Sequence, residues 1–339
     1  MVNFTYVISK VKKMRKIIKI IASIVLCLFC GIGFVGCKDN DDKLSIYMPD
    51  GAPALAMSKL MYENKNFGRD TEYHVVAASN ISNYILNKSA DIAIMPINMA
   101  SKITGDGESY KICATVTNGN LYVVGSENIS SLQGLVGKVI GVIGRSNVPD
   151  LNFRYLLNEA GIQYEEGESA VAGKVVIRYF NDASVLLPLL QQGQMKFGLI
   201  PEPAVSNLLK MSNDMHIELD IQELWEGGSY PQAVMVVRTS LAGDKDFVRE
   251  IINELKTVEN WVTENVADAV NAVNSHLEED MTGSLKNTMA STAVINSNIK
   301  IYDTSSASEI ARMKSYLEKI RTVAPAAIGD YTDNIFCKL

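Results

Sequence analysis

The 339-residue sequence carries 32 Lys and Arg against 38 Asp and Glu, a formal net charge of −6. The first 36 residues hold six basic and no acidic residues, so the formal charge of the remaining 303 residues is −12. This acidic balance argues against a nucleic-acid partner and against binding to a broad anionic membrane surface, because both need clustered Lys and Arg. A chain of 303 residues also exceeds the size at which a single core stops growing, so we expect two lobes.

The sequence begins with a basic segment, an apolar run and a cysteine. Basic residues between Lys10 and Lys19 precede an apolar run over residues 20–35, and Gly36-Cys37 comes before a polar stretch. This order is typical of a secretory signal peptide, which is removed and takes no part in the fold. Residues 34–37 resemble a bacterial lipobox, which implies cleavage after residue 36, a lipid chain on Cys37 and a short linker over residues 37–43. The protein would then be lipid-anchored on the extracytoplasmic face of the cell membrane.

A membrane-spanning anchor over residues 17–35 is the alternative reading of this segment, since about 20 apolar residues cross a bilayer. The glycines that crowd the cysteine, and the polar stretch after it, favour the lipidated form. Met14 is a second possible start of translation. In either reading the rest of the chain faces outward.

Short strands alternate with helices from residue 44 onward. We expect strands at residues 44–48, 73–77 and 91–95, a helix from Pro53 to Met61 and another at residues 81–88. Gly51 and Pro53 supply the start signal of the first helix. Strands that alternate with helices predict βαβ units and a parallel sheet.

The same order of elements restarts at residue 138. A strand at residues 138–143 precedes a helix from Pro149 to Gly161, and further strands are expected at 175–180 and 197–200. Apolar strands at residues 121–124 and 233–237 lie between the halves and predict two crossovers. The fold class is therefore α/β, with two doubly wound lobes joined by two crossover strands. The first lobe comprises residues 44–124 and 234–339, including two amphipathic helices near its end, and the second comprises residues 125–233.

Few residues of this sequence suit catalysis or metal binding. Beyond residue 37 the only cysteines are Cys113, expected as a small buried hydrophobe, and Cys337, expected as a free thiol. The three histidines are His74, His216 and His276. They are widely separated and lack metal-ligand spacing, so we expect no metal site, no cofactor and no catalytic residue.

Ligands of open parallel sheets bind beyond the carboxyl ends of the strands, where loops meet the starts of helices. The loops that fit this description lie in both lobes, so we expect the site in a cleft between them. The candidate binding residues are Asp50, Gly51, Ala52, Pro53, Ser79, Asn80, Asn98, Tyr122, Gly144, Arg145, Ser146, Asn147, Glu202 and Tyr230. Gly, Ser and Asn are also ordinary turn residues, which is the alternative explanation for many of them.

Three charged candidates leave the charge of the ligand open. Arg145 could hold a carboxylate, sulfonate or phosphate, or it could be a solvated arginine at the rim. Asp50 would attract an amine unless it caps the following helix. Glu202, which lies between two prolines, is favoured as a structural residue near the hinge.

Several segments together resemble one known family. Residues 50–56, 130–142, 153–162, 201–203 and 230–237 are similar to the solute-binding proteins of nitrate, taurine, sulfonate and thiamine-precursor ABC importers, over a span from about residue 44 to about residue 265. The resemblance implies a type II periplasmic-binding-protein fold that closes on its ligand, and delivery of the ligand to a membrane permease powered by a separate ATPase.

The function we expect is therefore that of an extracytoplasmic solute-binding lipoprotein for a small polar or heterocyclic solute, and not that of an enzyme. A same-fold enzyme and a tethered ligand-sensing domain are the alternatives. The former would turn over a substrate, and the latter would lack neighbouring permease and ATPase genes.

Overall fold

The computed structural model describes residues 43–286 and 288–339, and residues 43–339 form one compact unit. The expected signal peptide, most of the expected linker and the lipidation candidate Cys37 lie outside the described residues. In the described part of the chain, no helix is both long enough and apolar enough to cross a membrane.

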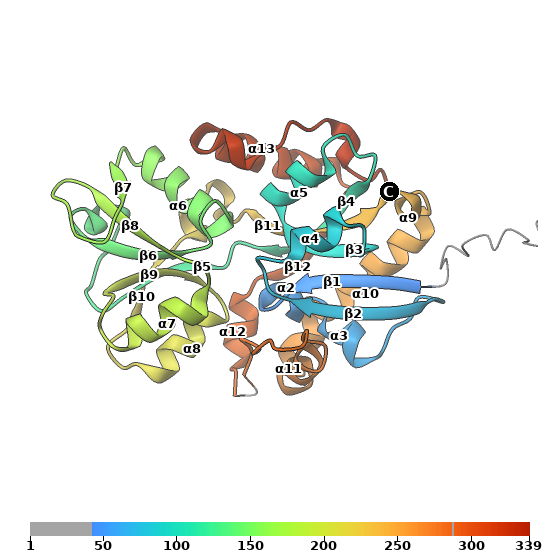
Figure 1. Ribbon diagram of the computed structural model, residues 1–339, viewed down its shortest axis with the longest axis horizontal. Coiled ribbons are helices and arrows are strands. Elements are labelled where there is room, and N and C mark those ends of the chain that lie inside the picture. Colours follow the sequence, from blue (N-terminus) through green and yellow to red (C-terminus); the bar gives the residue numbers. More distant parts are fainter. Residues whose placement is uncertain (1–42, 287) are drawn as a thin grey trace, which may run out of the picture. The chain divides into compact units, whose positions relative to one another are not determined.

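The first sheet has six strands in the order β12-β4-β11-β3-β1-β2 (Figure 1). Its strands are β1 (Lys43–Pro49), β2 (Asp70–Val76), β3 (Ile92–Pro96), β4 (Tyr110–Asn118), β11 (Pro231–Arg238) and β12 (Ile299–Asp303). β1 pairs in parallel with both β2 and β3, whereas β11 runs antiparallel to β3 and β4. β3 lies inside the sheet and is a continuous apolar run, whereas β2 at the sheet edge is polar over its first three residues.

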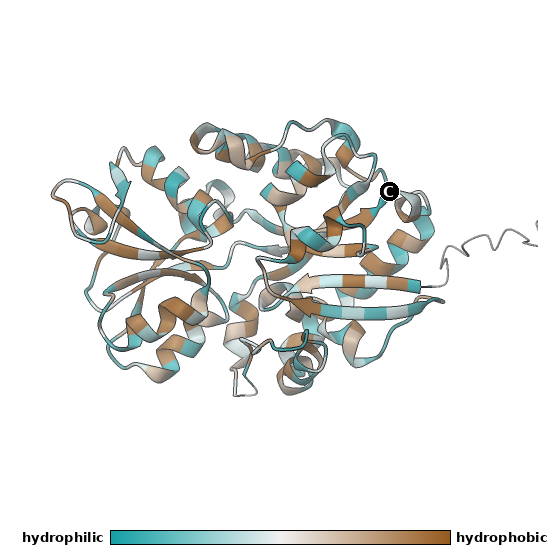
Figure 2. Cartoon of the chain, viewed as in Figure 1, coloured by the Kyte–Doolittle hydropathy of each residue, from teal (hydrophilic) through white to brown (hydrophobic). Residues whose placement is uncertain are grey.

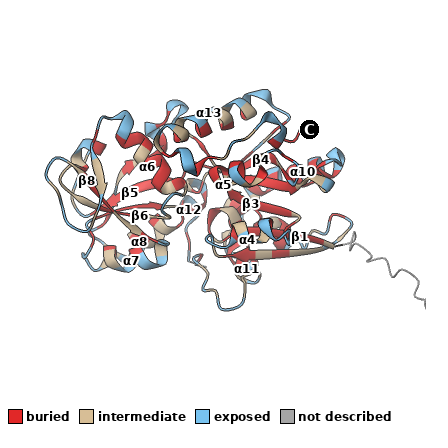
Figure 3. Ribbon diagram, turned by 45° about the horizontal axis from the view of Figure 1, so that its top comes forward, coloured by how far each residue is buried: buried red, intermediate tan, exposed pale blue. Residues whose placement is uncertain are grey.

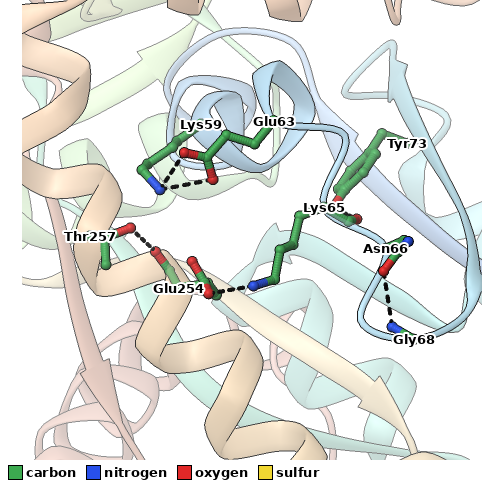
Figure 4. Close-up of polar contacts among 8 residues, drawn as sticks. All are labelled: Lys59, Glu63, Lys65, Asn66, Gly68, Tyr73, Glu254 and Thr257. Carbon is green, nitrogen blue, oxygen red and sulfur yellow. Dashed lines mark hydrogen bonds and ion pairs between the residues drawn. The ribbon is translucent and has the colours of Figure 1, made fainter.

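Nine helices accompany the first sheet, and two of them, α10 and α13, are the longest helices in the described part of the chain. The nine are α2 (Ala52–Leu55), α3 (Ser58–Tyr62), α4 (Ile81–Leu86), α5 (Ile97–Thr104), α9 (Thr239–Ala242), α10 (Lys245–Glu264), α11 (Val266–Asn274), α12 (Ser291–Asn296) and α13 (Ala307–Val323). α10 is fastened to the loop after α3 by an ion pair of Lys65 with Glu254 at 2.6 Å, beside the hydrogen bond of the Tyr73 hydroxyl to the Lys65 carbonyl (Figure 4).

The second sheet repeats this arrangement in the order β10-β5-β9-β6-β8-β7. Its strands are β5 (Leu121–Gly125), β6 (Val139–Ile143), β7 (Tyr164–Glu166), β8 (Val175–Phe180), β9 (Phe197–Pro201) and β10 (His216–Asp220). Its helices are α6 (Val148–Glu159), α7 (Ala183–Gln191) and α8 (Ala204–Met211). β6 is parallel to β8 and β9, as β1 is to β2 and β3, and β5 runs antiparallel to β9 as β11 does to β3.

Two chain segments pass between the sheets (Figure 1). Residues 119–120 connect β4 of the first sheet to β5 of the second, and residues 221–230 lead from β10 back to β11. The two crossovers touch, because the Gly119 N–H donates to the Tyr230 carbonyl at 2.9 Å. The α/β fold class with two doubly wound sheets and two crossovers is thus confirmed.

The buried apolar residues form layers on both faces of the sheets (Figures 2 and 3). One cluster covers one face of the first sheet, where it includes Ile112 of β4, and continues to Ile140 of β6 in the second sheet. A second cluster covers the other face of the first sheet, and a third includes Leu186 and Leu190 of α7. The apolar core therefore runs from one sheet into the other along one face.

Two details differ from the sequence-based expectations. The helix expected from Pro53 to Met61 is split into α2 and α3, because the Met57 N–H turns back to the Ala54 carbonyl and tightens the chain there. β5 pairs in the second sheet and the whole of β11 in the first, whereas we expected residues 121–124 in the first lobe and 231–233 in the second. Each crossover strand belongs to the sheet that it enters, so the division into lobes is best proposed at residues 119–120 and 229–230.

Candidate functional site

The candidate loops follow the carboxyl ends of parallel strands in both sheets. In the first sheet β1, β2 and β3 end at Pro49, Val76 and Pro96, and in the second β6 and β9 end at Ile143 and Pro201. Because the strands within each set are parallel, their following loops gather at one edge of each sheet.

Asp50 and Gly51 form the loop after β1. The Asp50 carboxylate accepts hydrogen bonds from the Gly51 N–H at 2.8 Å and from the Ser284 N–H at 2.6 Å. Gly51, with φ 101°, is the N-cap residue of α2, so Asp50 does not cap that helix by its side chain. Ala52 and Pro53 form the first turn of α2. A Cβ at Gly51 would meet no atom within 4 Å, which leaves the backbone there open to an approaching molecule.

The loop after β6 is held in shape by a buried carboxylate. Asp150, 1% exposed, accepts a hydrogen bond from the Ser146 N–H at 2.8 Å and one from the Tyr179 hydroxyl at 2.7 Å, and it pairs with Arg154 at 3.0 Å. Gly144 and Ser146 have positive φ angles of 65° and 61°. The left-handed conformation is uncommon for serine, and the bond to Asp150 helps to fix it.

Asn98 and Ser146 bring the two sets of loops together. Asn98 lies in the first turn of α5, and its Nδ2 donates to the Ser146 carbonyl at 3.4 Å. The Asn98 side chain is buried, with the residue 3% exposed, yet its Oδ1 has no hydrogen-bond partner among the described residues. A buried acceptor left unpaired costs about 1–3 kcal/mol, so this oxygen is a place where a donor group would bind favourably.

Comparisons with known proteins identify the fold. No family model and no curated protein matches the sequence. Among solved structures, an ABC transporter protein from Parabacteroides distasonis matches with a TM-score of 0.69 and 17% identity over 87% of this chain and 99% of that chain. The periplasmic aliphatic sulphonate-binding protein of Escherichia coli matches with a TM-score of 0.63 and 11% identity over 87% and 90%.

A third match is the ligand-binding component of an ABC-type import system from Staphylococcus aureus, solved with zinc bound, at a TM-score of 0.58 and 13% identity over 86% of this chain and 96% of that chain. The chain has the type II periplasmic solute-binding fold. At these identities the shared property is the fold, so the residues that would bind a solute have to be argued from this chain alone.

Glu202 is a buried residue that directly follows β9 and contacts the first crossover. The residue is 2% exposed, and its carboxylate accepts hydrogen bonds from the Ser206 N–H at 3.0 Å and the Ser206 hydroxyl at 2.8 Å. Burial raises the pKa of Glu202, and the bonds from Ser206 and Asn296 oppose that rise. Its carboxylate is thus occupied by protein donors, and its backbone N–H donates to the Asn120 carbonyl at 3.0 Å.

Arg145 belongs to the same loop as Ser146, and its side chain is engaged at the surface. Its side chain is 62% exposed, forms an ion pair with Glu166 and lies over the Tyr179 ring at 5.1 Å. Asn147, two residues further along the chain, is the N-cap residue of α6 but makes no capping bond with its side chain. The guanidinium is thus engaged at an exposed position rather than held ready in a buried one.

The two candidate tyrosines belong to different surroundings. Tyr230, 1% exposed, lies in a buried aromatic group with Trp225 at 5.2 Å and Tyr316 at 5.7 Å between ring centroids. Tyr122, 8% exposed, lies in β5, and burial together with the nearby Asp220 raises its pKa to about 12. Tyr230 is therefore a packing residue of the crossover.

Ser79 and Asn80 lie on the surface after β2. Both are exposed, and the Ser79 hydroxyl donates to the Asn80 side-chain oxygen at 3.4 Å. Among the described residues, neither side chain forms a hydrogen bond or ion pair with the loops of the second sheet, so the two stay candidates by position alone.

Several residues of this region escaped the sequence reasoning. Asn120 in the first crossover binds the carbonyls of Glu202 and Ser297 through its Nδ2, both at 3.4 Å, and accepts from Gln232 at 2.6 Å. The dipeptide Gly119-Asn120 between two apolar strands was the available signal. No sequence pattern pointed to Ser284 as a partner of Asp50. None pointed to the cavity of about 510 Å³ beside it, which Asn274 and Leu285 help to line. Within residues 43–286 and 288–339, no group of His, Cys, Asp or Glu is placed to hold a metal ion.

Proposed function

We propose that this protein is an extracytoplasmic, lipid-anchored solute-binding protein that delivers a small polar or heterocyclic solute to an ABC importer. The fold, the signal segment and Cys37 support the proposal together. The observation that carries it is the meeting of Asn98 and Ser146, where a hydrogen bond between loops of the two sheets lies beside an unpaired buried acceptor.

The solute we propose is neutral or cationic and carries N–H or O–H donors. Asn98 Oδ1 offers an acceptor. The Asp50 carboxylate adds negative charge in the loop after β1, the strand that pairs with β3. Of the candidate residues only Arg145 carries a positive charge that could pair with an anion such as a sulfonate, and it is already paired with Glu166 at an exposed position. The sulphonate specificity of one structural neighbour is therefore not carried over to this chain.

Binding would hold the two sheets together by adding contacts to both sets of loops. The Asn98–Ser146 bond is long at 3.4 Å, so it contributes little by itself. A solute that donates to Asn98 Oδ1 and also contacts the Gly144–Asn147 loop favours the arrangement in which the loops meet, and it shifts the population toward that form.

A thermal-shift panel followed by calorimetry tests the solute proposal. The panel pairs amino-substituted heterocycles and amides with sulfonates, nitrate and carboxylates of similar size. A donor-bearing solute at about 100 times its Kd should stabilise the protein by about 2.7 kcal/mol. Binding of sulfonates or nitrate in preference to the donor-bearing solutes contradicts the proposed solute class, and no binding at millimolar concentration contradicts the function.

Asn98→Ala is the matching variant for whichever solute binds. Loss of a hydrogen bond to a buried acceptor should weaken binding about tenfold, at a cost of about 1–1.5 kcal/mol. Asn260→Ala, on the exposed face of α10, is the control and should leave affinity unchanged. Equal affinity of the wild type and Asn98→Ala would remove Asn98 from the site.

The lipid anchor is tested on the whole chain in a bacterial host. Wild-type protein should incorporate radiolabelled palmitate and sediment with membranes, because two or more acyl chains hold a protein at a bilayer. Cys37→Ser should abolish labelling and release the processed protein or leave the precursor uncleaved. Cys113→Ala is the control and should label as the wild type does; labelling of Cys37→Ser would contradict the anchor.

A further inference from the structure

The segment over residues 333–339 lies alongside β4. Phe336 and Ile112 form an isolated parallel β-bridge, and the Cys337 N–H donates to the Ile112 carbonyl at 2.8 Å. Cys113 and Cys337 each follow one member of that bridge in the sequence. The register therefore sets these two residues side by side, although more than 200 residues separate them along the chain.

The side chains of the two cysteines share one face of the first sheet. Successive side chains of a strand point to opposite faces. Ile112 and Phe336 both belong to the apolar cluster on one face, and Cys113 and Cys337 both belong to the cluster on the other. The alternation thus turns both thiols in the same direction.

Thr304 hydrogen-bonds the backbone of both β4 and the 333–339 segment. Its hydroxyl lies 3.1 Å from the Cys113 carbonyl and 2.6 Å from the Cys337 carbonyl, and its N–H donates to the Cys113 carbonyl at 3.0 Å. The Cys113 thiol lies 3.6 Å from the Lys111 carbonyl, and the Cys337 thiol lies 3.7 Å from the Ala242 carbonyl. The neighbouring Cys113 thiol lowers the pKa of Cys337 to about 7, while burial raises the pKa of Cys113. The two thiols are therefore close enough to influence each other's ionisation.

We propose that Cys113 and Cys337 form a disulfide that fastens the 333–339 segment to β4 when the protein meets an oxidising environment. Neighbouring residues of a parallel pair have Cα separations within the range of about 4.4–6.8 Å that disulfides require. Both residues are buried, at 0% and 4% exposure, so a reductant would reach the bond only when the 333–339 segment opens.

The chemistry needs a disulfide as oxidant and is balanced as thiol–disulfide exchange. The Cys337 thiolate attacks one sulfur of an external disulfide, forms a mixed disulfide and releases one thiolate. Cys113, after losing its proton to water, attacks Cys337 Sγ and displaces the second thiolate. Two protein thiols become one disulfide, and the external disulfide becomes two thiols. Opening of the 333–339 segment, or reaction before it docks, gives the oxidant access.

The test equilibrates the full chain with glutathione buffers of increasing oxidised fraction, blocks free thiols with N-ethylmaleimide and maps the peptides by mass. We expect a Cys113–Cys337 cross-linked peptide as the main oxidised product. Because the bond closes a loop of more than 200 residues, oxidation should raise Tm by about 5 °C, and dithiothreitol should reverse the change.

Cys337→Ala and Cys113→Ala should each lose the redox-dependent Tm change, whereas Cys37→Ser should keep it. If both thiols remain alkylable in oxidised glutathione alone, or pair only with glutathione or Cys37, the proposal is overturned. The wild-type redox titration decides the matter even if a variant does not fold. Because no solute is used, the outcome is independent of the proposed transport function.

Discussion

The two regions that join the sheets are built from different interactions. On one side Trp225 stacks on Tyr155 of α6 at 4.7 Å and lies 5.2 Å from Tyr316 of α13, all within one buried cluster. At the strand ends the contacts are polar: Asn98 donates to the Ser146 carbonyl at 3.4 Å, and Asn207 of α8 donates to the Ser284 carbonyl at 3.3 Å. Burial of aromatic surface is non-directional and does not depend on a ligand, whereas long hydrogen bonds can be exchanged for bonds to a solute.

α13 makes the aromatic side a common support of both sheets. It packs against α6 of the second sheet and against α5 and β11 of the first, and Asn152 of α6 donates to the Tyr316 hydroxyl at 3.0 Å. A fixed apolar junction thus leaves the polar junction free to respond to a bound molecule.

Trp225→Ala should have the largest effect, because it removes the ring that contacts α6, the crossover and α13. Truncation of a buried aromatic residue costs about 3–5 kcal/mol of the free energy of unfolding. Trp261→Ala is the matched control, since Trp261 is half-buried and contacts Tyr62, which is 52% exposed. Urea denaturation followed by circular dichroism measures both; equal losses would mean that the aromatic junction is no special support.

Gly119→Ala should strain the first crossover. A Cβ at Gly119 would lie 2.5 Å from the Tyr230 ring and 2.7 Å from the Gln222 side chain. Overpacking of this kind costs about 1–3 kcal/mol. Gly243→Ala is the control, because φ at Gly243 is −67° and its nearest neighbours are at 3.9 Å. The control should be neutral or slightly stabilising in the same denaturation experiment; a neutral Gly119→Ala would contradict tight packing of the crossover.

The sequence predicts the positions of the strands better than the junctions between the two sheets. The strand expected at residues 138–143 is observed as β6 at Val139–Ile143, because a buried parallel strand has an apolar pattern that is local. Exchange of β5 and β11 between the sheets depends on long-range pairing, which no local pattern encodes. Residue types at the strand ends could thus be predicted as candidates, but not their partners.

The partners of the candidate residues show why the site was harder to predict. Asp50 binds Ser284, which lies 234 residues away, and Arg145 pairs with Glu166 across a helix and a turn. Both contacts follow from tertiary packing, so the sequence alone left the charge of the site undecided. The pairing of Cys113 with the 333–339 segment escaped for the same reason.

Glu202→Gln should change the pH dependence of stability. Burial raises the pKa of Glu202 above 4.5, so the folded protein binds more protons than the unfolded chain. The stabilisation by the protonated form is present below about pH 4.5 and is lost as pH rises through the folded-state pKa. Glu202→Gln cannot ionise and should lack this loss. Denaturation of the wild type and the variant from about pH 4 to about pH 8 measures the difference.

The exposed Glu168→Gln is the control for that series and should follow the wild type at every pH. The direction of the difference is what matters: the wild type should lose stability relative to Glu202→Gln as pH rises. A difference that grows in favour of the wild type would mean that the Ser206 and Asn296 bonds outweigh burial, and that Glu202 is held as a carboxylate.

Arg145→Ala should have the smallest effect on the free energy of unfolding. It tests whether solute binding depends on the exposed surface beside Ser146 or only on the polar contacts between the sheets. Its ion pair with Glu166 is between side chains that are 62% and 51% exposed, so its removal should cost less than about 1 kcal/mol and less still in high salt. Arg249→Ala, whose pair with Asp246 on α10 is also exposed, should behave alike. Calorimetry should then give the same solute affinity for Arg145→Ala as for the wild type. A tenfold weakening confined to Arg145→Ala would mean that this guanidinium leaves Glu166 to hold an anionic solute, and would reverse the proposed solute class.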